Sequence, residues 1–272
     1  MTLAARLAPR LPPRLVGAGA ALLYPWFEPE LRRLADFCPR GGTAVDVGGW
    51  YGPWSRRLAR RSDRVVTVEP VPHLARQLAA AAPGNVTVVQ AAAADRTGEA
   101  TLWLPPGGRG DRGVSSLVRR EVHGTALEVR CAALDDLLEE LRVTDVGLIK
   151  VDVDGGELAV LRGAERVLRR DRPALFVELE ARIQPLGPVL SLLNDHGYTG
   201  WVLPRRTWVP LSSFDLTGHQ YRRGHVAEHG LLRRTLAPHR RYVNSVLFLP
   251  SGHRPRAAPH LARCRRVLPA PW

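Results

Sequence analysis

VGLIKVDVDGGELAVLRG, at residues 146–163, joins a strand-like apolar run to a helix-like segment and so decides the fold class. The run carries Lys150 and Asp152, and the turn after it carries Asp154 and Glu157. Lys150 is the only lysine in the chain, since the other 38 of its 39 basic residues are arginine. Codon bias explains a single lysine as well as function does. Arginine would not be equivalent there, however, because its planar group is larger and keeps its proton.

Strand-like and helix-like segments alternate on both sides of this stretch. Such alternation predicts an α/β fold with a doubly wound, mainly parallel sheet, whose ligands bind beyond the carboxyl ends of the strands. The predicted strands are 43–48, 65–69, 85–90, 99–105, 126–132, 146–153, 173–180, 198–204 and 242–250, and the predicted helices are 54–60, 73–82, 134–142, 156–170 and 185–197. We expect a helical extension at 1–40, one domain at 41–250, and a disordered tail rich in Pro and Arg at 251–272.

The composition admits several partners. A net charge of +13 suits a nucleic acid or an anionic membrane, but the arginines are scattered and form no stripe, which argues against nucleic acid. Cys38, Cys131 and Cys264 show no paired spacing, so a reducing cytoplasm is the expected location. The apolar run at 15–27 is too short to span a bilayer. We expect a cap helix or a membrane-surface contact there, with signal-peptide cleavage as an alternative, and no transmembrane segment elsewhere.

DVGGWYG, residues 46–52, follows the first predicted strand and opens a helix. Gly48 and Gly52 permit a tight turn with a close backbone approach to a ligand. Trp50 and Pro53 break the dinucleotide pattern GxGxxG, and no phosphate-loop GK[ST] follows. An acidic residue before the first glycine would repel a phosphate but attract a cation. The turn therefore favours S-adenosylmethionine, whose sulfonium and amino groups Asp46 would attract.

Two further carboxylates are expected at the same edge of the sheet. Glu69 ends the second strand, about 20 residues after the glycine turn, where an acidic group accepts hydrogen bonds from ribose hydroxyls. Asp95 follows the third strand and is a candidate for the adenine amino group. The alternative for Asp95 is a turn-forming role before Thr97 and Gly98.

These segments resemble the FkbM-type family of S-adenosylmethionine-dependent methyltransferases from about Gly42 to Glu180, and more loosely to Pro250. The resemblance rests on VDVGGWYG, VTVEP, AAAADRTGEATL, and LIKVDVDGGELAVLRGA followed by PALFVELE. It implies a Rossmann-like, seven-stranded methyltransferase sheet with an antiparallel last strand, YVNSVLFLP. It also implies O-methylation of a hydroxyl on a small metabolite, natural product or sugar. The predicted cofactor-binding residues are Asp46, Gly48, Gly49, Trp50, Tyr51, Gly52, Glu69, Pro70, Ala94 and Asp95.

The chain departs from the family pattern at two places. Trp50 stands where the family usually has a small polar residue, often Asn, and its ring would either stack on the methionine portion or narrow the pocket. Asp154 replaces the Glu of the usual DxEG motif, so any contact that it makes must be closer. Residues 1–40 and 204–241 match nothing in the family.

Methyl transfer requires an aligned acceptor and a group that takes the hydroxyl proton. If the strand persists, alternation places Lys150, Asp152 and Asp154 on one face. Asp152 is the leading candidate for contacting the acceptor or the methionine amine, with Lys150 as the charge that organises the carboxylates. Asp154 and Glu157 complete the predicted catalytic set and also favour the start of the next helix.

The sequence also allows other interpretations of these residues and of the chain as a whole. The charges at 150–157 also fit a buried ion-pair cluster without catalysis, or a magnesium site, whereas Gly163 at the twelfth position excludes an EF-hand. HVAEH, residues 225–229, fits a zinc-protease pattern, but its flanking glycines favour a chance match in a loop. One of the nearby histidines is a candidate for binding the acceptor. The alternatives to an O-methyltransferase are a non-catalytic S-adenosylmethionine- or nucleoside-binding protein and a nucleic-acid methyltransferase.

Overall fold

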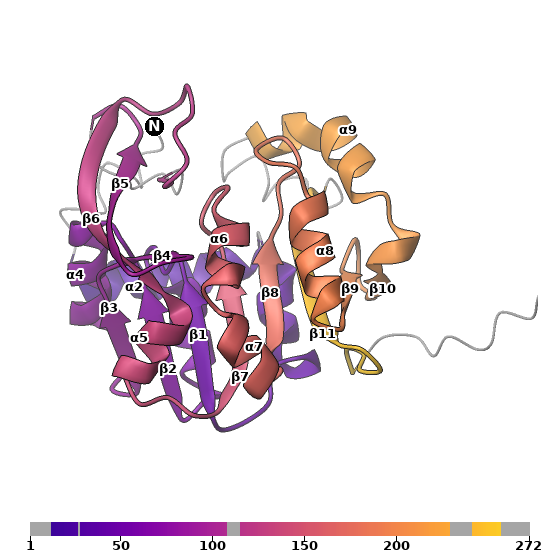
Figure 1. Cartoon of the computed structure of the whole chain (residues 1–272), viewed down its shortest axis with the longest axis horizontal. Helices are drawn as coiled ribbons and strands as arrows, with labels where there is room; N and C mark the ends of the chain where they lie inside the picture. Colours follow the sequence, from indigo (N-terminus) through magenta and orange to yellow (C-terminus); the bar gives the residue numbers. More distant parts are fainter. Residues whose placement is uncertain (1–11, 27, 108–114, 229–240, 257–272) are drawn as a thin grey trace, which may run out of the picture.

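The structure is a computed structural model that describes residues 12–26, 28–107, 115–228 and 241–256 (Figure 1). A central sheet of eight strands runs through it. In sheet order the strands are β10 (Val209–Pro210), β9 (Tyr198–Val202), β11 (Ser245–Pro250), β8 (Ala174–Glu178), β7 (Val146–Val151), β1 (Thr43–Val47), β2 (Arg64–Val68) and β3 (Val86–Val89). The five strands from β8 to β3 are parallel, which confirms the predicted mostly parallel α/β sheet.

The far end of the sheet differs from the seven strands that were predicted. β11 pairs antiparallel with both β8 and β9. An eighth strand, β10, pairs antiparallel with β9 through Val209 and Pro210. The chain turns back after β9, and proline ends the short pairing because it has no N–H to donate.

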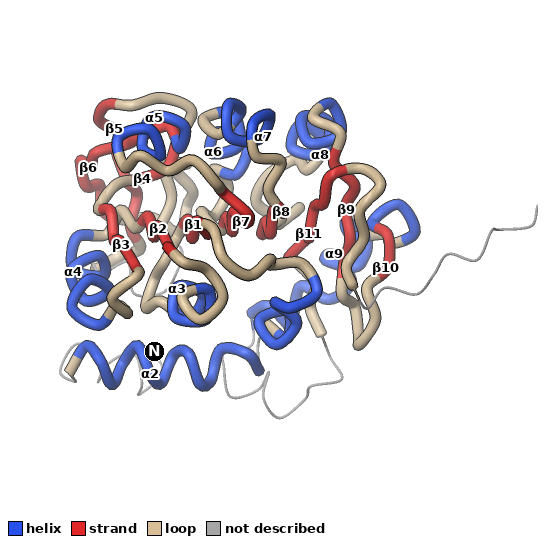
Figure 2. Tube along the Cα trace, turned by 90° about the horizontal axis from the view of Figure 1, so that it is seen from below, coloured by secondary structure: helices blue, strands red, loops and turns tan. Residues whose placement is uncertain are grey.

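Helices cover both faces of the sheet (Figure 2). One face carries α5 (Leu134–Glu140), α6 (Glu157–Arg162), α7 (Glu165–Arg170) and α8 (Gly187–Asp195). The other face carries α3 (Pro53–Leu58) and α4 (Pro72–Ala81), with α2 (Pro13–Leu23) lying outside them. The remaining helices are η2 (Tyr24–Trp26), η3 (Pro29–Asp36), η4 (Leu211–Ser213) and α9 (Leu216–Glu228).

Alternation along the central strands supplies a core on each face. In β7, Ile149 and Val151 pack into the cluster under α5–α8, whereas Leu148 packs into the cluster with Trp54 and Phe176 on the opposite face. All five residues of β1 are buried, as expected for a central strand covered on both sides. The apolar pattern that predicted these strands is therefore the pattern that packs the two layers.

A second sheet of three strands stands beside the first: β4 (Ala92–Ala94), β6 (Thr125–Ala133) and β5 (Gly98–Leu104). β4 approaches the predicted helix 156–170 so closely that a Cβ on Gly163 would lie 2.0 Å from the carbonyl oxygen of Ala94. The predicted single helix is accordingly two helices, α6 and α7, that meet at this point. Glycine is required there by close packing, since its φ is an ordinary −70°.

Several sequence predictions fall partly outside the described residues. The N-terminal extension is described from residue 12, and the predicted disordered tail only to residue 256. None of the helices in the described part of the chain has the length and apolar character that a membrane span requires.

Candidate cofactor and active site

The glycine turn between β1 and α3 lies directly against the segment that follows β7. Gly48 and Gly52 have φ of +79° and +77°, in the left-handed region that favours glycine. A Cβ on Gly48 would lie 1.9 Å from the carbonyl oxygen of Asp152. The amide of Asp152 donates a hydrogen bond of 3.1 Å to the carbonyl of Val47. Two segments that are about a hundred positions apart are thus held backbone to backbone.

Trp50 is also left-handed, with φ +47°. A bulky residue in this conformation costs about 1–3 kcal/mol, whereas Asn adopts it readily. This backbone geometry is a physical reason for the Asn that the family often has here. The indole ring packs edge-on against Tyr51 at 4.8 Å and lies 5.8 Å from the ring of Tyr24. Trp50 therefore joins the turn to the N-terminal segment.

Glu69 closes the turn from the end of β2. Its carboxylate accepts hydrogen bonds from the amides of Trp50 at 2.8 Å and Val71 at 3.0 Å. The side chain is buried. Burial raises the pKa of Glu69 to about 7, although these two amides act in the opposite direction. Glu69 is placed at the expected edge, and its contact with a ribose stays a prediction.

Lys150 is buried beneath the turn. Its Nζ lies 2.8 Å from the carbonyl oxygen of Gly48 and 3.3 Å from that of Val47. The same nitrogen lies 3.3 Å from Asp46 Oδ1 and 3.5 Å from Asp152 Oδ2. Burial lowers the pKa of Lys150, but the carboxylates of Asp46, Asp152 and Glu28 more than offset this and raise it above its ordinary value. The lysine is thus a fixed cation that contacts both the turn and the end of β7.

Asp46 faces inward, not toward the open edge of the sheet. It is fully buried, one carboxylate oxygen faces Lys150, and the other accepts a 2.5 Å hydrogen bond from Ser55. Ser55 in turn accepts a hydrogen bond of 3.0 Å from Thr67. The sequence predicted a direct contact of Asp46 with a cationic ligand; the structure engages its carboxylate with Lys150 and Ser55, and the ligand contact stays a prediction.

Asp152 is partly accessible, with 29% of its side chain exposed. Its charge acts on Glu178, the last residue of β8. Burial, together with the charges of Asp152 and Glu28, raises the pKa of Glu178 well above its ordinary value. Asn244 donates a hydrogen bond to Oε1 of Glu178. Sequence reasoning missed Glu178, although its place at the end of a predicted parallel strand was a usable signal.

Glu28 reaches the same place from the N-terminal segment. It accepts a 2.5 Å hydrogen bond from the indole of Trp54. Burial and the charge of Asp152 raise the pKa of Glu28 to about 8. Nothing in the sequence around Glu28 indicated this position, because the extension matches no known motif.

Asp154 and Glu157 shape the turn after β7. The strand ends at Val151, so the predicted alternation does not extend to Asp154, which has φ +58° and forms an ion pair with Arg120. Aspartate tolerates a left-handed backbone better than most residues, which gives a reason for it in place of the family's Glu. Glu157 is buried and accepts hydrogen bonds from the amide of Gly155 at 3.2 Å and from Gln184.

The remaining predicted cofactor residues lie around the turn. Tyr51 and Ala94 pack in one apolar cluster, so β4 approaches the glycine turn. Gly49 packs against Thr67, where a Cβ would lie 2.3 Å from its methyl group. Pro70 is half-buried and leads from Glu69 into α4. Asp95 is exposed and lies 3.6 Å from Arg96, so its adenine contact stays a prediction.

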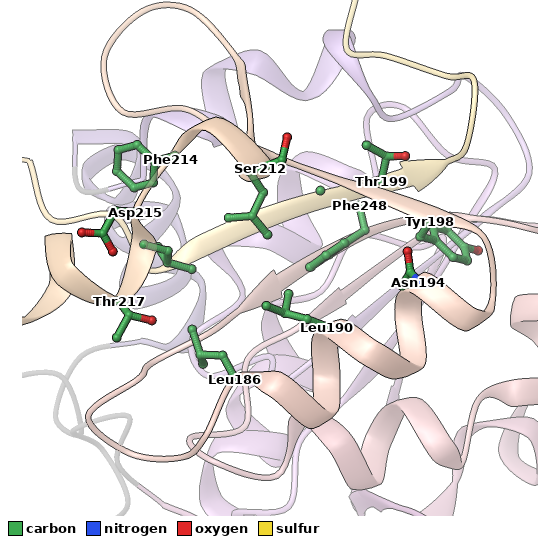
Figure 3. A pocket seen from close by; sticks show the side chains of 13 residues that line it. Leu186, Leu190, Asn194, Tyr198, Thr199, Ser212, Phe214, Asp215, Thr217 and Phe248 are labelled. Carbon is green, nitrogen blue, oxygen red and sulfur yellow. The ribbon is translucent and has the colours of Figure 1, made fainter.

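Two other candidate sites lie elsewhere. A pocket of 560 Å³ runs along α8 and is lined by residues such as Leu190, Phe214 and Phe248 (Figure 3), none of which belongs to the predicted cofactor set. In the described part of the chain, no cluster of three or more His, Cys, Asp or Glu is arranged to hold a metal. Of the HVAEH motif, residue 229 and the side chains at 225–228 lie outside the described structure. His219 accepts a 3.1 Å hydrogen bond from the amide of Val243.

We expect Lys150→Met to lower the free energy of unfolding by about 3–5 kcal/mol, because it leaves the buried Asp46 carboxylate without its counter-charge. Adding Asp46→Asn to this variant should recover a large part of that loss. Urea denaturation of the wild type, both single variants and the double variant measures the coupling. Strictly additive effects would contradict the importance of this ion pair.

The left-handed backbone at Trp50 gives a second expectation. Trp50→Asn and Trp50→Ala both remove the indole, but Asn adopts φ near +47° at lower cost. We therefore expect the Asn variant to be more stable than the Ala variant by about 1 kcal/mol in chemical denaturation. Equal stability of the two variants would show that the turn relaxes when the ring is absent.

Comparisons with known proteins find one matching sequence family and several similar solved structures. The sequence model described as "Methyltransferase FkbM domain" matches residues 42–199, more than half of the chain. Among solved structures, the methyltransferase FkbM from Methylobacillus flagellatus is 17% identical with a TM-score of 0.42, and the match covers 86% of this chain and 60% of that one. The O-methyltransferase TomG from Streptomyces achromogenes, in complex with SAM, is 13% identical with a TM-score of 0.39, and the match covers 92% and 88% of the two chains.

No curated protein matches the sequence. The chain spans less than two thirds of the length of the Methylobacillus protein. The family match covers the glycine turn, Glu69 and the 146–163 stretch, so it confirms the resemblance seen in the sequence. The chain belongs to the FkbM methyltransferase family.

Proposed function

We propose that the protein transfers the methyl group of S-adenosylmethionine to a hydroxyl of a small metabolite or glycan. The observation that carries this proposal is a convergence at one edge of the sheet. The glycine turn after β1, Glu69 after β2 and the Lys150–Asp152 pair at the end of β7 meet there. In an open α/β sheet this edge is where ligands bind.

The residues present fit this cofactor. Glu69 fixes the conformation of the turn through the amides of Trp50 and Val71, and Gly48 lets the turn pack against the carbonyl of Asp152. Asp46, Asp152 and Glu28 gather around one lysine, an acidic surplus that favours a cation over a pyrophosphate. We assign the turn 48–52, Glu69, Pro70, Ala94 and Asp95 to cofactor binding. When bound, the cofactor would supply an electrophilic methyl group carried on a sulfonium.

Within this proposal Lys150 is a positioning residue and not the base. The carboxylates around it keep it protonated. Its ammonium holds the Asp152 side chain and the Gly48 carbonyl in a fixed relation. Asp46, which was expected to meet the ligand, instead supplies the buried counter-charge of this lysine.

Asp152 is our candidate for orienting the acceptor hydroxyl and accepting its proton. Its side chain is 29% exposed and its carboxylate lies 3.5 Å from Lys150 Nζ, so it is both open to an acceptor and held in place by the lysine. Asp154 and Glu157 are assigned to the shape of the turn behind it, because Arg120, Gln184 and Gly155 engage their oxygens.

Calorimetry with S-adenosylmethionine and its demethylated product tests the cofactor assignment. We expect binding of both, and no binding at about 1 mM would overturn the assignment.

Asp152→Asn should lower turnover about 100-fold or more on an acceptor found in a panel of glycosides and hydroxylated natural products. The matched control is Asp195→Asn, the same change at an exposed position on α8. Cofactor binding without methyl transfer to any acceptor would favour the non-catalytic binding protein.

Cofactor affinity should rise with pH. Glu69 and Glu28, with pKa values of about 7 and about 8, are largely protonated at low pH. A bound cation favours their ionised forms, so binding releases protons and tightens as the pH rises. We expect about tenfold tighter binding of S-adenosylmethionine at about pH 8.5 than at about pH 6.

The demethylated product is the matched ligand, because it lacks the sulfonium charge. Its affinity should change less over the same range. Calorimetry in two buffers of different ionisation enthalpy counts the released protons directly. Equal pH dependence of the two ligands would show that the sulfonium lies away from these carboxyl groups.

A further inference from the structure

The N-terminal helix α2 and the short η2 after it present large apolar side chains to solvent. Leu15, Leu22 and Trp26 are 61%, 72% and 60% exposed, and Leu23 is also exposed. The other large exposed apolar side chains among the described residues are Val118, Val122 and Tyr221. Exposed apolar bulk is therefore concentrated between residues 15 and 26.

The helix is oriented with its small residues inward. Gly17 packs against the guanidinium of Arg56, where a Cβ would lie 2.9 Å from Nε. Ala20 packs against the apolar cluster that contains Tyr51. Leu15 and Leu22, seven positions apart, share the opposite face. A helix whose only role was packing on the domain would place its leucines inward.

Arginines border this exposed face near the end of α2. The guanidinium of Arg32 lies 4.5 Å from the centre of the Trp26 ring. Arg57 donates a 3.4 Å hydrogen bond to the carbonyl of Ala21. Burial lowers the pKa of Arg57, and the positive charges of Arg60 and Arg32 lower it further. Arg32 and Arg60 are both exposed.

The acidic residues of the same segment face inward. Glu30 is buried in an ion pair with Arg241, and Glu28 accepts a hydrogen bond from Trp54. The outer surface therefore combines apolar bulk with positive charge. Figure 2 shows α2 as the outermost element on this side of the molecule. An amphipathic helix that lies in the plane of an anionic membrane has this composition, with a tryptophan at the interface.

We propose that this surface, formed by Leu15, Leu22, Leu23, Trp26, Arg32 and Arg60 and here termed the α2 face, binds anionic phospholipid membranes. The leucines and Trp26 enter the boundary between headgroups and acyl chains, and the arginines contact lipid phosphates. The inner side of the same segment packs on Trp50 through Tyr24, so the membrane contact lies beside the glycine turn. The proposal is independent of methyl transfer.

Co-sedimentation of the full chain with vesicles tests the proposal. The vesicles are phosphatidylcholine alone, or phosphatidylcholine with about 30% phosphatidylglycerol. We expect binding to the anionic vesicles, weakened strongly by about 0.5 M salt. Leu22→Ser with Trp26→Ser should weaken binding about tenfold or more, because two exposed apolar anchors are lost. Trp26 fluorescence should shift to the blue on binding, against a Trp26→Phe background.

Matched controls distinguish binding through the α2 face from nonspecific adsorption to vesicles. The double variant Val118→Ser with Val122→Ser removes exposed apolar side chains at another place on the surface. Arg162→Glu makes the same charge change as Arg60→Glu, but at an exposed position on α6, on the opposite face of the sheet. Both controls should bind like wild type, whereas Arg60→Glu should bind more weakly. Equal loss in Arg162→Glu, equal binding to neutral vesicles, or no vesicle binding would each overturn the proposal. If the wild type forms a dimer that Leu22→Ser dissociates, and no vesicle binding is seen, the α2 face would be assigned to contact with a second copy of the chain instead.

Discussion

The contact of Lys150 with Asp46 is the interaction on which the candidate site depends. It crosses from β7 to β1 at the point where both strands end, and both side chains are buried. Neither charge is tolerable there alone, because the cost of desolvating one is offset only by the other. The ammonium also meets the carbonyls of Val47 and Gly48 and the carboxylate of Asp152. Oxygens thus approach one small cation from several directions, an arrangement that a planar guanidinium does not reproduce. This geometry gives the single lysine a structural role that an arginine would not fill.

The sequence predicted the parts of the fold that depend on local pattern. β1, β2, β7 and β8 lie where continuous apolar runs placed them, because a strand covered on both faces must be apolar throughout. Boundaries set by distant contacts were less predictable. β11 begins at Ser245 and not at Tyr242, since Asn244 turns its side chain to Glu178 and the amide of Val243 meets His219. The split between α6 and α7 depends on the approach of β4 to Gly163, which no local pattern reports.

In the candidate site, too, some features were predictable from the sequence and others were not. The glycine turn, Glu69, Lys150 and Asp152 were predicted to meet because parallel strands end at one edge of a sheet, and the structure brings them together. The direction of each side chain was not predictable in the same way. Asp46 occupies the expected position, but its side chain is directed toward Lys150, which supplies a buried counter-charge. Glu28 approaches from an extension with no motif, so only the folded chain brings it to Asp152.

The N-terminal segment gains its importance from having two different faces. Its inner face contributes Tyr24 and Glu28 to the surroundings of Trp50 and Asp152. Its outer face carries leucines and arginines that the domain itself does not use. The extension is accordingly a structural part of the candidate site, although it lies outside the residues that define the family.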